Sequence, residues 1–103
     1  MAQYELKLFN PETNKTEIFE KDFISVRKTQ EALKIIEDQE KGQTDLESFN
    51  SQVAFIASVF DGVDSDMILD GLDASTGVDT LQTLFFRILG YDEKKIKEGL
   101  EKL

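Results

Sequence analysis

Five aspartates are concentrated in the stretch "VFDGVDSDMILDGLD", from Val59 to Asp73. Carboxylates this close together could bind Ca²⁺, take part in acid–base chemistry, or cap helices. An EF-hand loop needs oxygen ligands at positions 1, 3, 5 and 12 and a glycine at position 6. Counting from Asp64 places Ile68 at position 5, and counting from Asp61 places Val63 at position 3. Neither register is a calcium loop, so we interpret the aspartates as residues at helix ends, where they cap a helix or meet its dipole.

The composition removes most of the side chains from which active sites are built. The chain of 103 residues has no cysteine and no histidine. It therefore lacks thiolate nucleophiles, the commonest general base and the commonest transition-metal ligand. Its glycines form neither GxGxxG nor GxxxxGK[ST], the two common phosphate-binding patterns. We predict a protein that is not an enzyme and that uses no cofactor and no metal.

The net charge of −9 arises entirely in the middle of the chain. Ten acidic residues and one lysine lie between Glu37 and Asp73, whereas the remainder carries equal numbers of acidic and basic residues. Such a surface repels phosphate backbones, which disfavours nucleic-acid binding. Solubility alone explains the charge, and a basic protein partner would also suit it.

The N-terminus and the hydropathy pattern indicate a cytoplasmic protein. "MAQYELKLFN" has no basic region followed by an apolar segment, so it is not a signal peptide. No run of the sequence approaches the ~20 apolar residues of a membrane span. We expect no membrane association.

Periodicity at the N-terminus predicts a β-hairpin over residues 3–20. "YELKLF" alternates from Tyr4, with Tyr4, Leu6 and Leu8 on one face. "NPETNK" has the composition of a turn, and "TEIF" returns as a second strand. Two strands alone are marginally stable in water, so we expect the hairpin to pack on helices.

Capping residues and apolar stripes predict a helical array over residues 25–90. The first helix follows Ser25 and ends at Gly42, and the third follows Asp64. The fourth follows Ser75 or Thr76 and ends at Gly90. The apolar residues expected to be buried include Ala32, Leu33, Ile35, Ile36, Met67, Ile68, Leu69, Leu72, Val78, Leu81, Leu84, Phe85, Ile88 and Leu89.

The second helix carries the clearest stripe. Thr44 and Glu47 have the spacing of a capping box, and Gly62 ends the helix. Its stripe, with steps of three and four residues, consists of Leu46, Phe49, Val53, Ile56 and Phe60.

The sequence therefore predicts a mainly α (α+β) protein in which an N-terminal β-hairpin is followed by four to five helices. Residues 1–90 are expected to form a single domain. Residues 91–103 would add a short C-terminal amphipathic helix or a frayed tail, because Ile96, Leu100 and Leu103 share one narrow stripe.

Several apolar residues lie off these stripes, which indicates helices that are buried on more than one side. In a small chain such residues favour self-association or a bound helix. The candidate partner or self-association contacts are Phe55, Val59, Phe86, Ile96, Leu100 and Leu103.

The order of the segments resembles a known family. The hairpin "YELKLFN…TEIFE" leads into the basic-to-acidic helix "SVRKTQEALKIIEDQE", which is followed by an aromatic helix ending "VFDG". An acidic "DSDMILDGLDA" and a closing "TLQTLFFRILG" come next. From Tyr4 to Gly90 this order is similar to the tail assembly chaperones of long-tailed, siphovirus-type phages and prophages of Gram-positive bacteria.

The resemblance implies a non-enzymatic protein that binds the tape measure protein and keeps it soluble during tail morphogenesis. It also implies recruitment of tail tube protein, action in the host cell cytoplasm, and absence from the mature virion. Two alternatives stay open. One is a structural tail or head–tail connector subunit, and the other is an acidic adaptor or inhibitor that binds a basic protein partner.

Overall fold

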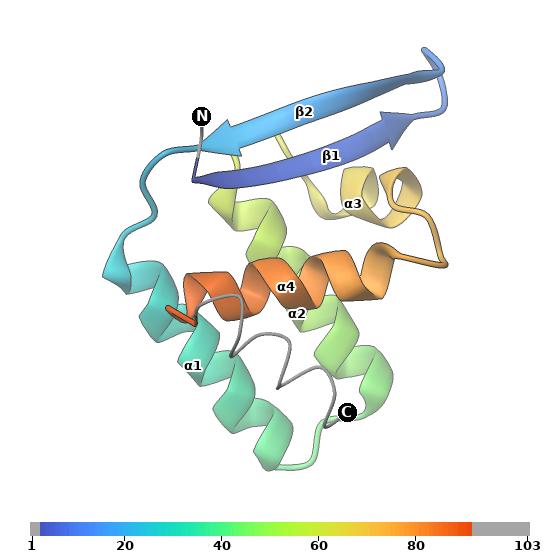
Figure 1. Ribbon diagram of the computed structural model, residues 1–103. Helices are drawn as coiled ribbons and strands as arrows, with labels where there is room; N and C mark the ends of the chain where they lie inside the picture. The colour runs from blue at the N-terminus through green and yellow to red at the C-terminus, as the bar shows by residue number, and fades with distance from the viewer. Residues whose placement is uncertain (1–2, 92–103) are drawn as a thin grey trace.

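The computed structural model describes residues 3–91, in which two strands are followed by four helices (Figure 1). The strands are β1 (Tyr4–Asn10) and β2 (Lys15–Lys21); the helices are α1 (Val26–Glu40), α2 (Asp45–Val59), α3 (Ser65–Gly71) and α4 (Gly77–Ile88). This order confirms the predicted mainly helical α+β class with an N-terminal hairpin. The further helix predicted from Asp92 onward lies outside the described residues.

The alternation of side chains decides which face of the hairpin is buried. The two strands pair antiparallel, with Leu6 opposite Phe19 and Leu8 opposite Glu17. Leu6 and Leu8 are buried, and Tyr4 and Phe19 pack against the core beside them. The predicted inward face of β1 is therefore confirmed, and the intervening residues of β1 face solvent.

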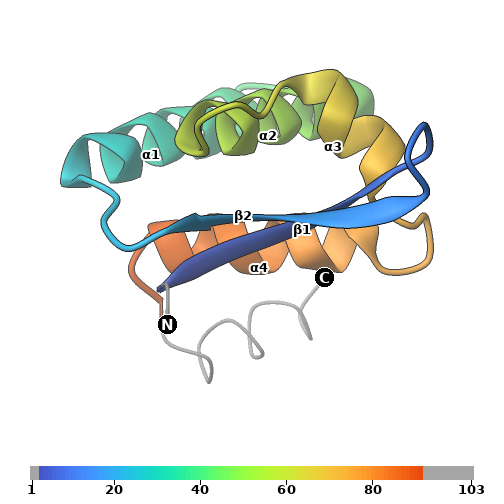
Figure 2. The ribbon, with the colours of Figure 1, turned by 90° about the horizontal axis from the view of Figure 1, so that it is seen from above.

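The hairpin lies across one end of the helical array (Figure 1). Seen from above, α1, α2 and α3 lie on one side of the hairpin and α4 lies on the other (Figure 2). β1 contacts α3, and α2 contacts α1, α3 and α4. The second helix is therefore the central element of the array.

Local hydrogen bonds fix the starts of α2 and α3. Thr44 Oγ1 accepts from the backbone N–H of Glu47 at 3.1 Å, and the Glu47 carboxylate accepts from the N–H of Thr44 at 3.2 Å. This confirms the predicted capping box. Asp64 accepts from the N–H of Met67 at 2.9 Å and caps α3. Ser25 occupies the N-cap position of α1 without a capping side-chain bond.

The core forms around α2. Val53, Ile56 and Phe60 of the predicted stripe are buried. Phe55, Ala57 and Val59 lie off that stripe and are buried as well, because neighbours pack on several sides of the helix. The other buried apolar residues are Leu6, Leu8, Ala32, Ile68, Leu81, Leu84, Phe85 and Ile88.

Four residues that periodicity assigned to the buried side are exposed instead. Leu46 and Val78 are 68% and 49% exposed. Each is the second residue of its helix, where few neighbours reach. Leu33 faces solvent beside the buried Ala32, and Leu69 does so beside the buried Ile68. Adjacent helical positions point about 100° apart, so both members of such a pair are buried only where neighbours pack on more than one side of the helix.

A glycine sets the distance between α3 and β1. A Cβ atom placed on Gly71 would lie 3.0 Å from the Cβ of Leu8 and 3.0 Å from the backbone oxygen of Phe9. It would also lie 3.3 Å from the backbone nitrogen of Phe9. The helix therefore rests directly on the backbone of β1, an approach that only glycine permits.

We predict that Gly71→Ala destabilises the protein by about 1–3 kcal/mol, because the added methyl group meets backbone that cannot rotate away. Helix propensity alone predicts the opposite sign, a gain of about 1 kcal/mol. The free energy of unfolding from urea titration distinguishes the two. Asp70→Ala, an exposed position in the same helix, is the control and should change stability by less than about 0.5 kcal/mol.

Candidate functional site

The structure places the predicted partner contacts in three different environments. Phe55 and Val59 are only 6% and 5% exposed. The Phe55 ring meets the Phe85 ring edge to face, with centroids 5.6 Å apart. Both residues belong to the core of the chain, so a partner cannot reach them in this conformation. Their expected role as contacts is corrected accordingly: burial within the chain explains the apolar residues off the stripe of α2.

Phe86 is the predicted contact that remains partly accessible. It is half-buried, and its ring stacks on that of Tyr91, with centroids 5.7 Å apart. Tyr91 itself is exposed. The other three candidates, Ile96, Leu100 and Leu103, lie outside the described residues and stay predictions.

An apolar groove opens between α2, α3 and α4. It has a volume of about 290 Å³. Ile68 and Leu81 are buried at its base, whereas Leu69 and Val78 are about half exposed at its rim. Leu46 lies one turn before the groove residue Phe49 on the same side of α2 and is even more exposed. We call this feature the apolar groove and define it by Phe49, Ile68, Leu69, Leu72, Val78 and Leu81.

The groove lies in the acidic part of the chain. Between Gly42 and Phe86, the segment that forms α2, α3 and most of α4, there are eight carboxylates and no lysine or arginine. Asp73 lines the groove itself. The apolar floor thus has one carboxylate beside it and belongs to an acidic segment, which favours an apolar ligand that carries positive charge.

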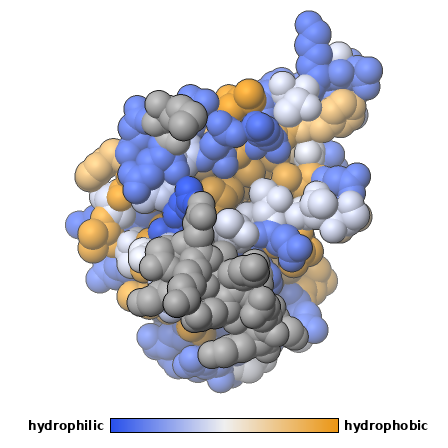
Figure 3. Space-filling view, viewed as in Figure 1, coloured by the Kyte–Doolittle hydropathy of each residue, from blue (hydrophilic) through white to orange (hydrophobic). Residues whose placement is uncertain are grey.

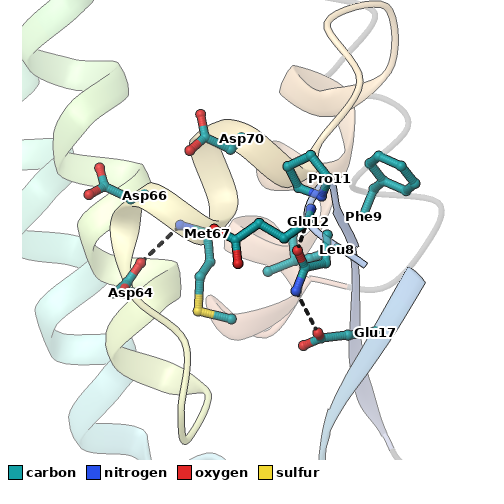
Figure 4. A pocket seen from close by; sticks show the side chains of 10 residues that line it. Leu8, Phe9, Pro11, Glu12, Glu17, Asp64, Asp66, Met67 and Asp70 are labelled. Atoms are coloured by element: carbon teal, nitrogen blue, oxygen red, sulfur yellow. Dashed lines mark hydrogen bonds between the residues drawn. The ribbon is translucent and has the colours of Figure 1, made fainter. Parts of the chain in front are cut away.

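A second hollow, of about 260 Å³, lies between the turn of the hairpin and α3 (Figure 4). Its floor contains Leu8, Phe9, Pro11 and Met67, and five carboxylates line it: Glu12, Glu17, Asp64, Asp66 and Asp70. Figure 4 shows Asp66 and Asp70 on the far side of α3, pointing away from the hairpin. The carboxylates therefore do not converge on one point.

Two of the carboxylates in this hollow accept hydrogen bonds from groups of the same chain. Asp64 caps α3, and Glu17 accepts from the Asn10 side-chain amide at 3.0 Å. Within residues 3–91 no cluster of three or more potential ligands is arranged to hold a metal ion. The contact of Asp64 is that of a helix-end residue, as the sequence predicted.

Comparison with known proteins decides between the remaining classes. The profile of the family described as phage tail chaperone protein matches residues 1–102. The chain belongs to the phage tail chaperone family. No match was found among curated proteins or among solved structures.

Membership in the phage tail chaperone family is consistent with the chemistry of the chain. The family is non-enzymatic, and its partners are tail proteins. None of the helices within residues 3–91 combines the length and the hydropathy needed to cross a membrane. A tail chaperone needs an accessible apolar surface, and the apolar groove provides one in concave form with a single carboxylate in its lining.

Sequence reasoning missed the groove because it counted Leu46, Leu69 and Val78 as core. Two signals were available. Leu46 and Val78 stand at the very start of their helices, and Leu69 directly follows another apolar residue, Ile68, in a seven-residue helix. Such positions cannot all be covered by a chain of this length.

We predict a pH-dependent contribution from Asp73, at the edge of the groove. The Ser75 hydroxyl and then the Ser75 backbone N–H donate to its carboxylate and lower the pKa of Asp73 below the ordinary value. A carboxyl group with a lowered pKa in the folded state contributes stability above its unfolded pKa. That contribution is lost as the pH falls through the folded pKa. Ser75→Ala should raise the Asp73 pKa in an NMR titration, and Ser48→Ala should leave it unchanged.

Proposed function

We propose that this tail chaperone binds a helical segment of the tape measure protein in the apolar groove. In a long-tailed phage of a Gram-positive host it would keep that protein soluble in the host cytoplasm until the tail assembles. The observation that carries the proposal is the groove itself: exposed leucine and valine side chains line a concave surface between three helices. Apolar surface gathered in one concave place is typical of a protein interaction site.

The shape of the groove suits one helix of the client. An amphipathic helix presents apolar residues at i, i+3, i+4 and i+7 and places them in a hydrophobic groove. The exposed residues Leu69 and Val78 come from two different helices and line the groove, so they can contact a bound helix from two sides. Phe49 and Leu72 are half-buried and supply further apolar surface.

The charge of the surround restricts which client segment fits. Asp73 lines the groove, and the segment from Gly42 to Phe86 carries eight carboxylates and no cation, so basic residues beside the client's apolar face would be attracted. Acidic residues in the same places would be repelled, which gives the interaction specificity as well as a faster encounter. We therefore expect the bound segment to be a basic amphipathic helix.

A reversible contact of this kind fits the rest of the proposed cycle. The chaperone would hold the tape measure protein apart from other copies, help tail tube protein to assemble around it, and then leave. It would be absent from the mature virion. Finding the chain in purified particles would instead favour a structural connector subunit.

We predict that Leu69→Asp combined with Val78→Asp abolishes co-purification of the tape measure protein, because two carboxylates would enter the apolar face of the complex. The measurement is co-expression with the tape measure protein, followed by pull-down and native mass spectrometry. Both positions are half exposed, so the fold should tolerate the change, and circular dichroism verifies this.

Leu33→Asp is the matched control. Leu33 is 55% exposed on α1, and it does not line the apolar groove. Its substitution makes the same chemical change at similar exposure and should leave the soluble complex intact. Equal loss of the complex in Leu33→Asp, or a complex that survives Leu69→Asp/Val78→Asp, contradicts binding in the groove.

A further inference from the structure

Among residues 3–91, no segment pairs with the outer edge of β2. The sheet of the described chain has two strands, so β2 is paired on one side only. In Figure 1 β2 is the outermost strand, with β1 between it and α3, and in Figure 2 no helix is drawn over β2. The outward N–H and C=O groups of such an edge can donate to or accept from only water or another chain, which makes it a template for strand pairing.

The other edge of the hairpin is closed. α3 packs on β1, and Gly71 lies against the backbone oxygen and nitrogen of Phe9. A strand cannot approach β1 where α3 occupies its backbone. The open edge of β2 is therefore the side from which the hairpin can be extended.

Apolar side chains accompany the open edge. Ile18 on the solvent face of β2 is 56% exposed, and Phe23, just beyond the strand, is 77% exposed. In Figure 3 the surface over the hairpin is mostly blue and white, with separate orange patches among the hydrophilic residues. A second strand beside β2 would bring its own side chains next to Ile18 on the same face of the sheet.

Symmetry limits how two copies of β2 can pair. A two-fold axis perpendicular to the sheet makes two copies of one strand antiparallel, and residues directly opposite one another then come from the same face. The inward face of β2 consists of Lys15, Glu17, Phe19 and Lys21, because these residues lie opposite Asn10, Leu8, Leu6 and Tyr4. In a symmetric pair each of them must oppose another inward residue.

Three such registers pair five or more residues of β2. In the register centred on Glu17, the two Glu17 side chains lie opposite each other. In the register centred on Ile18, Lys15 of each copy lies opposite Lys21 of the other. Both oppose like charges, which destabilises a strand pair. Centring on Phe19 places Glu17 opposite Lys21 at both ends and Phe19 opposite Phe19 in the middle. Charge complementarity thus selects one register.

We propose that the protein forms a symmetric dimer through β2, in which two hairpins join into a four-stranded antiparallel sheet. Glu17 of each copy pairs with Lys21 of the other, and the two Phe19 side chains meet at the two-fold axis. The paired charges specify the register and exclude the others, which is how edge strands commonly control their partners. This interface is separate from the apolar groove, so the inference does not depend on the proposed client.

A charge exchange tests the register directly. Glu17→Lys alone would place lysine opposite lysine, and Lys21→Glu alone would place glutamate opposite glutamate. Each single variant should weaken the dimer at least about tenfold by sedimentation equilibrium, since two attractive pairs become repulsive. The two single variants mixed in equal amounts should form a heterodimer, because lysines of one chain then oppose glutamates of the other. The double variant Glu17→Lys/Lys21→Glu should dimerise by itself.

The heterodimer distinguishes pairing between chains from effects within one chain. Lys21 forms an ion pair with Asp61 at 3.6 Å, and Glu17 accepts from Asn10. If a single variant lost the dimer because these intrachain contacts were broken, mixing the two variants would not restore it. If the loss came from like charges between the chains, the mixture would restore the dimer. Glu20→Lys is the matched control for Glu17→Lys: it makes the same charge change on the solvent face, opposite Ile18, and should leave the dimer intact.

Three results would overturn the proposal. The first is a wild-type chain that stays monomeric at all accessible concentrations. The second is a dimer that neither single variant weakens, and the third is a mixture of single variants that stays monomeric. The groove variant Leu69→Asp/Val78→Asp should still dimerise, so loss of client binding and loss of the dimer are scored independently.

Discussion

The structure depends on the burial of α2 on several sides at once. A helix of a small protein commonly buries one stripe and exposes the remainder. Here Ile56 is fully buried, and Phe55, Ala57 and Val59, which point elsewhere, are buried too. The other helices are arranged around this one element, and the hairpin packs on α3. A loss of apolar volume in α2 would therefore loosen contacts to α1, α3 and α4 together.

The exposed apolar surface follows from the same arrangement. The chain has a limited number of residues with which to cover α2, and α3 supplies only seven of them. Its Ile68 packs inward, which leaves Leu69 outside, and the start of α4 leaves Val78 outside next to it. The apolar groove is thus what remains when a short helix has to serve both the core and the β1 strand. In the proposed function, this uncovered apolar surface binds the client.

Sequence patterns predicted the elements well and the surface less well. The hairpin, the capping box of Thr44 and Glu47, and the cap at Asp64 depend on interactions between neighbours in sequence, and the structure contains all three. The exposure of Leu46 and the burial of Phe55 depend on which other elements pack beside α2. Periodicity gives the direction of a side chain around its helix but does not give the number of neighbours that helix will have. The groove and the open edge of β2 also depend on which elements pack together, so periodicity did not predict them.

The contact at Gly71 joins two surfaces that otherwise lie apart. α3 carries Leu69 toward the groove and rests on the β1 backbone through Gly71, with no side chain between them to absorb a displacement. At this point α3 cannot move toward the sheet without displacing the backbone of β1. If a ligand in the groove favoured one position of α3, linkage would require that constraints on the hairpin alter the affinity of the groove by the same factor. A seven-residue helix thus contributes side chains to one surface and directly contacts the strand backbone that supports the other.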